Sequence, residues 1–176
     1  MRIFILFITI LFHATTISQI SKPKMVIAVV VDQMKYEYVY RFWDDFGEKG
    51  FKKLIDKGTF CRNTHYNYVP TYTGPGHASI FTGTTPAVHG IIGNSWYSRD
   101  SLKPVYCAGD WKAQTICLCQ KPHDQLNKGD GKMSPRNLLT TTIGDQLKIV
   151  DTSSKVFGVS LKDRGSILSA GFSADG

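Results

Sequence analysis

Continuous apolar runs and amphipathic segments alternate along the chain. Residues 25–31 (MVIAVVV) form an uninterrupted apolar run rich in β-branched side chains, a pattern typical of a strand buried on both faces of a parallel sheet. Two further strands are expected over residues 59–68 and 155–161. Helices are predicted between the strands, over residues 36–46, 51–57, 77–82 and 134–150. This alternation indicates an α/β fold with a mostly parallel central sheet and helices on both faces.

Charged residues follow two of the predicted strands. Asp32 follows the first apolar run, and Lys162 and Arg164 follow the third. Ligands in open α/β sheets bind beyond the carboxyl ends of the strands, so we expect these side chains to converge there with Thr73, which follows the second predicted strand. Arginine and lysine both suit phosphate oxygens. Two alternatives stay open: Asp32 as a helix N-cap, and Lys162 with Arg164 as exposed loop charges.

The second predicted strand leads into a turn with the sequence PTYTGPGH, residues 70–77. Its two glycines allow the backbone to approach a bound group closely, and Pro75 fixes one φ angle. A helix beginning near Gly76 would direct free N–H groups and its positive end at an anion. A threonine hydroxyl beside such a cradle is suited to phosphoryl transfer through a covalent intermediate.

The first 20 residues have the pattern of a secretory signal peptide. Met1 and Arg2 precede an apolar stretch over residues 3–12, which is too short to span a bilayer comfortably. Cleavage is expected near Ser18 or Gln19. A buried strand or helix, or an uncleaved anchor, is the alternative. The prediction is therefore a periplasmic or secreted protein without a stable membrane anchor.

The chain has four cysteines, which suits an exported protein with two disulfides. The sequence permits three pairings and does not choose among them, and free thiols or metal ligation are the alternatives. Three of the four cysteines lie in residues 96–132, a stretch without clear periodicity that we interpret as an irregular insertion or cap. The cysteines are Cys61, Cys107, Cys117 and Cys119.

The composition favours an ordered, basic globular protein. Of the 176 residues, 42% are hydrophobic and 20% charged, which argues against disorder, and the formal net charge is +7. Lysines and arginines are scattered, without a run of five, so a nucleic-acid-binding patch is not indicated. The charge fits attraction of small phosphorylated substrates better than nucleic-acid binding.

Five segments together resemble a known family. They resemble bacterial phosphate-irrepressible alkaline phosphatases, in the type I phosphodiesterase/nucleotide pyrophosphatase branch of the alkaline phosphatase superfamily. The resemblance covers nearly all of the chain after the signal peptide. The segments are VVVDQM at 29–34, YVPTYTGPGHAS at 68–79, TGTTPAVHGIIGN at 82–94, GKMSPR at 131–136 and SLKDRG at 160–165.

The resemblance implies a zinc-dependent phosphomonoesterase with a phosphothreonine intermediate. It makes Thr73, the second threonine of the turn, the nucleophile, and Asp32 a zinc ligand. Two zinc ions in such an enzyme stabilise the attacking and leaving oxygens of an in-line displacement. The family's metal-binding histidines come later in the chain. His65, His77 and His89, which recur at twelve-residue intervals, are therefore expected to be structural.

The resemblance also implies four phosphate-binding groups. The Gly74 backbone N–H and Asn94 would bind phosphate oxygens, and Lys162 and Arg164 the remaining oxygens of a monoester. A dianionic monoester has one more charged oxygen than a diester, so the two cations favour monoesterase activity. A phosphodiesterase or nucleotide pyrophosphatase is the alternative enzyme.

The sequence departs from the family's pattern at its end. In the family, later aspartates and histidines complete both zinc sites, and of that set only Asp32 is present. Residues 21–176 are therefore expected to be the N-terminal part of an alkaline phosphatase-like domain, incomplete at the C-terminus and inactive alone. A non-catalytic phosphate-binding fragment is the second alternative. We expect a monomer.

Overall fold

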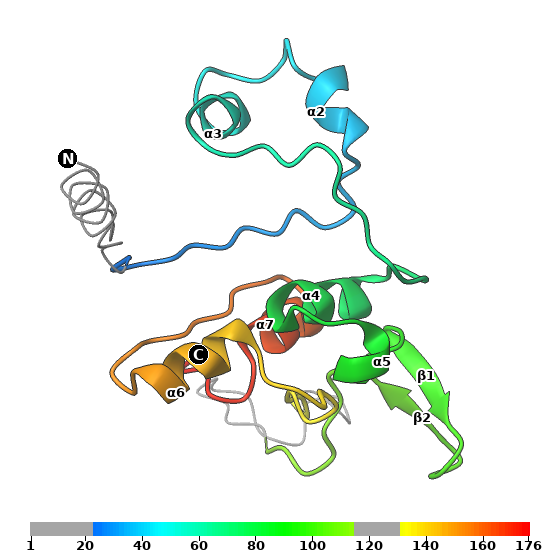
Figure 1. Ribbon diagram of the computed structural model, residues 1–176. Coiled ribbons are helices and arrows are strands. Elements are labelled where there is room, and N and C mark those ends of the chain that lie inside the picture. The colour runs from blue at the N-terminus through cyan, green and yellow to red at the C-terminus, as the bar shows by residue number, and fades with distance from the viewer. Residues whose placement is uncertain (1–22, 115–130) are drawn as a thin grey trace, which may run out of the picture. The chain divides into compact units, whose positions relative to one another are not determined.

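The computed structural model describes residues 23–114 and 131–176 (Figure 1). The chain divides into two units, Met1–Val31 and Asp32–Gly176. The predicted signal peptide over residues 1–20 lies outside the described residues, as do Cys117 and Cys119. No helix in the described part is long and apolar enough to cross a membrane.

Two short helices, α2 (Glu37–Arg41) and α3 (Phe51–Lys57), come first in the larger unit. The helix predicted over residues 36–46 is shorter than expected, because beyond Arg41 the chain continues in turns. The bounds predicted for α3 are confirmed. Gly58 caps it, with its N–H donating to the Leu54 carbonyl, and a Cβ on Gly58 would lie 2.6 Å from that oxygen.

Helix α4 (Thr73–Thr82) begins earlier than predicted. The expected start was Gly76, but the Gly76 N–H already donates to the Tyr72 carbonyl at 2.9 Å, so the predicted turn is the first turn of the helix. Gly83 ends it in the left-handed region, with φ of 66°. The next helix, α5 (Pro86–His89), has proline at its first position.

Helix α7 (Asp163–Ala170) packs against α4 (Figure 1). Gly165 in its first turn packs against Ser160, because a Cβ there would lie 2.5 Å from Ser160 Oγ, whereas it would be at an ordinary contact distance of 3.7 Å from His77 Nε2 of α4. The sequence pattern did not predict this helix. Its first turn carries Asp163 and Arg164, so the packing of α7 determines where the predicted phosphate-binding arginine lies.

The helix predicted over residues 134–150 is wrong in its first half, because α6 (Ile143–Val150) starts nine residues later than expected. Its start is fixed by a capping box. Asp145 N–H donates to Thr142 Oγ1 at 3.2 Å, and Thr142 N–H donates to Asp145 Oδ2 at 2.8 Å. The Ser134–Pro135 pair, which suggested an N-cap, lies in a turn.

A hairpin of β1 (Ser95–Ser98) and β2 (Lys103–Tyr106) occupies the start of the stretch predicted to be irregular (Figure 1). The strands are antiparallel, with Ser95 opposite Tyr106. Four-residue strands are too short to show a clear alternation of polar and apolar positions. The hairpin matters for function because β2 ends at Tyr106, next to the buried Cys107.

The three predicted strands are not part of a sheet in the described residues, where the hairpin is the single sheet. Residues 25–31 carry exposed apolar side chains, for example Val26 at 78%. In residues 155–161, Val159 is 96% exposed. Backbone pairing defines a strand, and these runs have no partner strand here. The mostly parallel central sheet therefore stays a prediction.

A small apolar core joins α4, α7 and the end of the hairpin. Partly buried Trp96 and Tyr106 pack against it. This core packs α4 against the chain segment that follows β2. The buried core residues are Ala78, Ile91, Cys107, Leu138 and Leu168.

Candidate active site

The predicted nucleophile and the predicted metal ligand lie together. Thr73, the first residue of α4, donates a hydrogen bond from Oγ1 to Oδ2 of Asp32 at 3.1 Å. Thr73 is half-buried and Asp32 is exposed in a turn. The two residues are 41 positions apart in the sequence. The carboxylate therefore orients the hydroxyl that the sequence analysis singled out.

Two predicted phosphate-binding groups also meet. The Gly74 N–H donates to Asn94 Oδ1 at 2.7 Å. A Cβ on Gly74 would lie 3.1 Å from Cys107 Sγ and 3.2 Å from Asn94 Oδ1, so the close approach favours glycine. The Asn94 Nδ2 group makes no hydrogen bond with the described residues and is available to an oxygen acceptor.

The start of α4 is itself suited to an anion. The helix has ten residues, and its first N–H groups and positive dipole end adjoin the Thr73 hydroxyl. Of these groups, the Gly74 and Gly76 N–H already donate to Asn94 Oδ1 and the Tyr72 carbonyl, and Pro75 has no N–H. The Thr73 N–H and Asn94 Nδ2 make no hydrogen bond with the described residues, so this end of the helix offers one backbone and one side-chain donor.

Arg164 lies in a polar chain with Tyr106 and Asp163. Arg164 Nη1 donates to Tyr106 Oη at 3.2 Å, and Tyr106 Oη donates to Asp163 Oδ1 at 2.7 Å. The hydrogen bond to Tyr106 is the main cause that raises the pKa of Arg164. Burial is the main cause that raises the pKa of Tyr106, so its hydroxyl stays protonated at neutral pH.

Lys162 lies apart from these contacts. It is the N-cap residue of α7 and is exposed, and its ammonium group makes no hydrogen bond or ion pair with the described residues. The structure thus brings Asp32, Thr73, Gly74 and Asn94 together. Arg164 is linked to the same region through Tyr106 and the neighbouring Cys107, whereas no contact places Lys162 there.

Cys107, one of the four cysteines expected to form disulfides, is a buried residue of this region. Its N–H donates to the Asn94 carbonyl at 3.0 Å. Burial raises the pKa of Cys107 to about 11, so the thiol is protonated and unreactive at neutral pH. Cys107 and the exposed Cys61 are both free. The prediction of two disulfides is therefore wrong for this structure.

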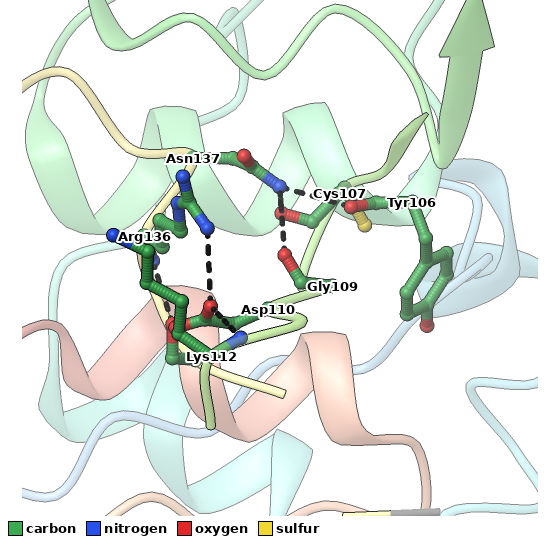
Figure 2. Close-up of polar contacts among 8 residues, drawn as sticks. Tyr106, Cys107, Gly109, Asp110, Lys112, Arg136 and Asn137 are labelled. Atoms are coloured by element: carbon green, nitrogen blue, oxygen red, sulfur yellow. Dashed lines mark hydrogen bonds and ion pairs between the residues drawn. The ribbon is translucent and has the colours of Figure 1, made fainter. Parts of the chain in front are cut away.

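An asparagine clamp fixes the chain that carries Tyr106 and Cys107 (Figure 2). Asn137 Nδ2 donates to the carbonyls of Tyr106, Cys107 and Gly109, at 3.0, 3.1 and 3.3 Å. Asp110, next to the clamp, accepts hydrogen bonds from Ser134 Oγ at 2.7 Å, Lys112 N–H at 2.9 Å and Arg136 Nη1 at 3.3 Å. No sequence motif marked Asn137, because its partners are backbone carbonyls about 30 residues away.

His89 is a structural histidine. It is fully buried, and its Nδ1 accepts a hydrogen bond from the Ile91 N–H at 3.1 Å. Its Nε2 therefore carries the proton and donates to Ser79 Oγ, 2.9 Å away. Burial lowers the pKa of His89, which keeps the ring neutral.

The other two evenly spaced histidines also have local partners. His77 Nδ1 donates to the Thr73 carbonyl at 2.9 Å, and His65 Nε2 lies 2.8 Å from Asn63 Oδ1. The described residues contain no group of three or more His, Cys, Asp or Glu side chains that could hold a metal ion. Each of the three histidines therefore has a hydrogen-bonding partner close by in the structure.

A zinc site cannot be assembled from the described residues alone. A structural or catalytic zinc takes three or four protein ligands, and Asp32 supplies one exposed carboxylate. The adjacent Thr73 hydroxyl is a weak ligand. Asp32 can therefore be one member of a metal site, and the other ligands would have to come from elsewhere.

The fold, the Thr73 turn and its donors together correspond to one family. Residues 26–152 match the family model of type I phosphodiesterase / nucleotide pyrophosphatase, and the chain belongs to this family. Within it, the chain is 46% identical to alkaline phosphatase PafA of Elizabethkingia meningoseptica over 158 residues, 89% of this chain and 28% of the relative. It is 43% identical to alkaline phosphatase PhoV of Synechococcus elongatus, over 89% of this chain and 27% of that one.

A solved structure shows which fold the chain resembles. The crystal structure of wild-type PafA matches with a TM-score of 0.78 and 45% identity, covering 86% of this chain and 28% of that chain. The described fold is therefore alkaline phosphatase-like. The chain spans little more than a quarter of the length of these relatives.

Proposed function

We propose that this chain forms the nucleophile-bearing part of an alkaline phosphatase, which hydrolyses phosphate monoesters through a phosphothreonine intermediate. The observation that carries the proposal is the geometry at the start of α4. There the Thr73 hydroxyl is bonded to Asp32, beside the Gly74 N–H and Asn94. The names of the relatives support phosphatase chemistry.

Each residue at this helix end has a defined role in the proposal. Thr73 loses its hydroxyl proton to solvent and Oγ1 attacks phosphorus, while the P–O bond to the leaving alcohol breaks on the opposite side; water then hydrolyses the phosphothreonine and releases phosphate. Asp32 orients the hydroxyl and contributes one ligand to the metal site. Asn94 Nδ2 binds an equatorial oxygen, where charge accumulates in the transition state, and the Gly74 N–H binds another once it releases Asn94 Oδ1.

Lys162 and Arg164 would distinguish monoesters from diesters. A monoester dianion offers an additional charged oxygen, which two cations on α7 can bind. The family description supports the alternative of a phosphodiesterase or nucleotide pyrophosphatase. A double Lys162→Ala, Arg164→Ala variant of a full-length version of the enzyme decides between them, because loss of monoester hydrolysis far beyond loss of diester hydrolysis supports the monoesterase assignment.

The 176-residue chain alone is proposed to be inactive, because the described residues supply one carboxylate of a metal site. A zinc ion, when bound, would stabilise a threonine alkoxide and the charge on phosphate. The remaining alternative is a non-catalytic fragment that holds phosphate at the Thr73 turn. Assay of the chain with added zinc and a chromogenic phosphate ester tests inactivity, and chelator-sensitive turnover would overturn it.

The chemistry itself is tested in a hybrid enzyme. Residues 26–176 of this chain would replace the matching segment of the Elizabethkingia phosphatase, so that the hybrid contains the rest of a family active site. We expect Thr73→Ala to abolish monoester hydrolysis and the acid-stable phosphoenzyme. Thr71→Ala is the matched control, because Thr71 is exposed and two residues away. Equal losses in both variants would contradict the assignment of Thr73.

The proposal extends to the protein's location and its substrates. We propose that residues 1–20 are a cleaved signal peptide and that the protein is periplasmic or secreted, acting as a monomer on small phosphate monoesters. The apolar stretch after Arg2 supports export. N-terminal sequencing of the exported protein tests the cleavage near Ser18 or Gln19.

A further inference from the structure

A tyrosine hydroxyl bridges a predicted phosphate-binding arginine and its neighbouring carboxylate. Tyr106 Oη accepts a hydrogen bond from Arg164 Nη1 at 3.2 Å and donates one to Asp163 Oδ1 at 2.7 Å. Asp163 and Arg164 are adjacent in sequence, yet no ion pair joins them in the part of the chain that the structure describes. The hydroxyl therefore connects the two charges without neutralising the arginine directly.

The tyrosine is held from two sides. Its ring packs against the apolar core, and its backbone carbonyl is bound by the Asn137 clamp (Figure 2). It is also the last residue of β2, whose antiparallel pairing with β1 fixes the register. A side chain whose ring and backbone are both held in place can keep its hydrogen-bonding partner in one orientation.

Arg164 depends on this tyrosine for its orientation. Its Nε is buried without a hydrogen-bond partner among the described residues, and the hydrogen bond that its side chain makes is the one to Tyr106. A planar guanidinium recognises phosphate only when its N–H groups point in the right direction. If the tyrosine hydroxyl were absent, Arg164 would be free to turn toward Asp163, and their charges would compensate each other.

We propose that Tyr106 is a positioning residue that orients Arg164 and keeps it from pairing with Asp163, and thereby favours doubly charged phosphate monoesters over singly charged diesters. The inference rests on the proposed function, because it assigns selectivity to the phosphate site at α4 and α7. It adds a residue from the hairpin to that site, 58 positions from Arg164 in the sequence.

The first measurement needs no ligand. Arginine side-chain ¹⁵N NMR on the full chain compares wild type with Tyr106→Phe, which removes the hydroxyl and keeps the ring. We expect the Arg164 Nε–Hε signal to shift and its guanidinium to rotate faster in the variant. Tyr97→Phe is the control, because Tyr97 lies on β1 of the same hairpin and is 60% exposed. An unchanged Arg164 signal in Tyr106→Phe would overturn the positioning role.

The second measurement compares the binding of a dianionic ligand with that of a monoanionic ligand. Inorganic phosphate, which is mainly dianionic at about pH 8, and the monoanion dimethyl phosphate are titrated into each protein. We expect Tyr106→Phe to weaken phosphate binding roughly tenfold or more, as loss of a hydrogen bond to a charged group predicts, and to leave dimethyl phosphate binding unchanged. A circular dichroism melt checks that the variant is folded.

The binding results distinguish failure of the Tyr106 proposal from failure of the proposed function. Equal weakening of both ligands in Tyr106→Phe indicates general loss of structure and overturns the selectivity role. If wild type and variant bind phosphate equally, the role of Tyr106 fails while the phosphate site stands. If the wild-type chain binds neither ligand and the hybrid enzyme does not turn over, the proposed function fails, and the selectivity role fails with it.

Discussion

Gly74 and Gly76 should respond to alanine substitution in opposite ways, because of the two only Gly74 is closely packed by other residues. A Cβ on Gly74 would lie 3.1 Å from Cys107 Sγ and 3.2 Å from the Gly93 carbonyl, whereas a Cβ on Gly76 would meet nothing within 4 Å. Gly76→Ala should therefore stabilise the protein by about 0.5–1 kcal/mol, because alanine favours the helix. Gly74→Ala should destabilise it by about 1–2 kcal/mol through overpacking. Urea unfolding of both variants measures the two effects, and changes of the same sign would contradict the packing described for Gly74.

A buried neutral histidine gives the folded protein a pH dependence of its own. Burial lowers the pKa of His89 below its unfolded value, so below about pH 6.5 the unfolded chain takes up a proton that the folded chain refuses. Stability from this residue is fully present above that pH and declines as the pH falls through it. We expect His89→Gln to remove this decline between about pH 7.5 and 5.5. His65→Gln, at an exposed position, should retain it, and a decline of equal slope in both variants would contradict the assignment.

At the scale of the element, α6 depends on its capping box. Thr142 and Asp145 are both buried, and Asp145 Oδ2 accepts hydrogen bonds from the Thr142 N–H and hydroxyl at 2.8 and 3.0 Å. Thr142→Ala should lower the free energy of unfolding by about 1–2 kcal/mol, because the Asp145 N–H loses its acceptor. Thr141→Ala is the control, since Thr141 is exposed and accepts only from Gln146. Equal losses in chemical denaturation would show that the cap is not what anchors this helix.

The same elements show how far the sequence alone could lead. Helix α3 was predicted because it combines an amphipathic run with a terminal glycine, both of which are local signals. The start of α6 was misplaced because Ser134–Pro135 has the same local signal as a true cap, and only burial of Thr142 distinguishes the two. Helix α7 was missed because Asp163–Ala170 has little amphipathic pattern and is stabilised by packing against α4.

For the whole molecule, motif residues were easier to predict than the contacts that support them. The motif around Thr73 could be located because hydroxyl, glycine and proline residues occur together within eight positions. The meeting of Thr73 with Asp32 was expected from the strand ends, although the predicted strands are not paired in the described residues. Tyr106, Cys107 and Asn137 were not assigned to the site. The hydrogen bonds from Asn137 to Tyr106 and Cys107 span 31 and 30 residues, the one from Arg164 to Tyr106 spans 58, and no local pattern encodes them.

Zinc affinity should depend on how many metal ligands the protein supplies. Asp32 offers one exposed carboxylate, and the described residues contain no cluster of three metal-binding side chains. Zinc affinity rises steeply with the number of ligands, so we expect the 176-residue chain to lose zinc on dialysis. The hybrid enzyme should retain metal and lose it, with its activity, on addition of a chelator. Metal analysis of both proteins, with Asp32→Asn in the hybrid, measures the contribution of this carboxylate. Stoichiometric zinc retained by the chain alone would show that its own residues, including those at 115–130, complete a site.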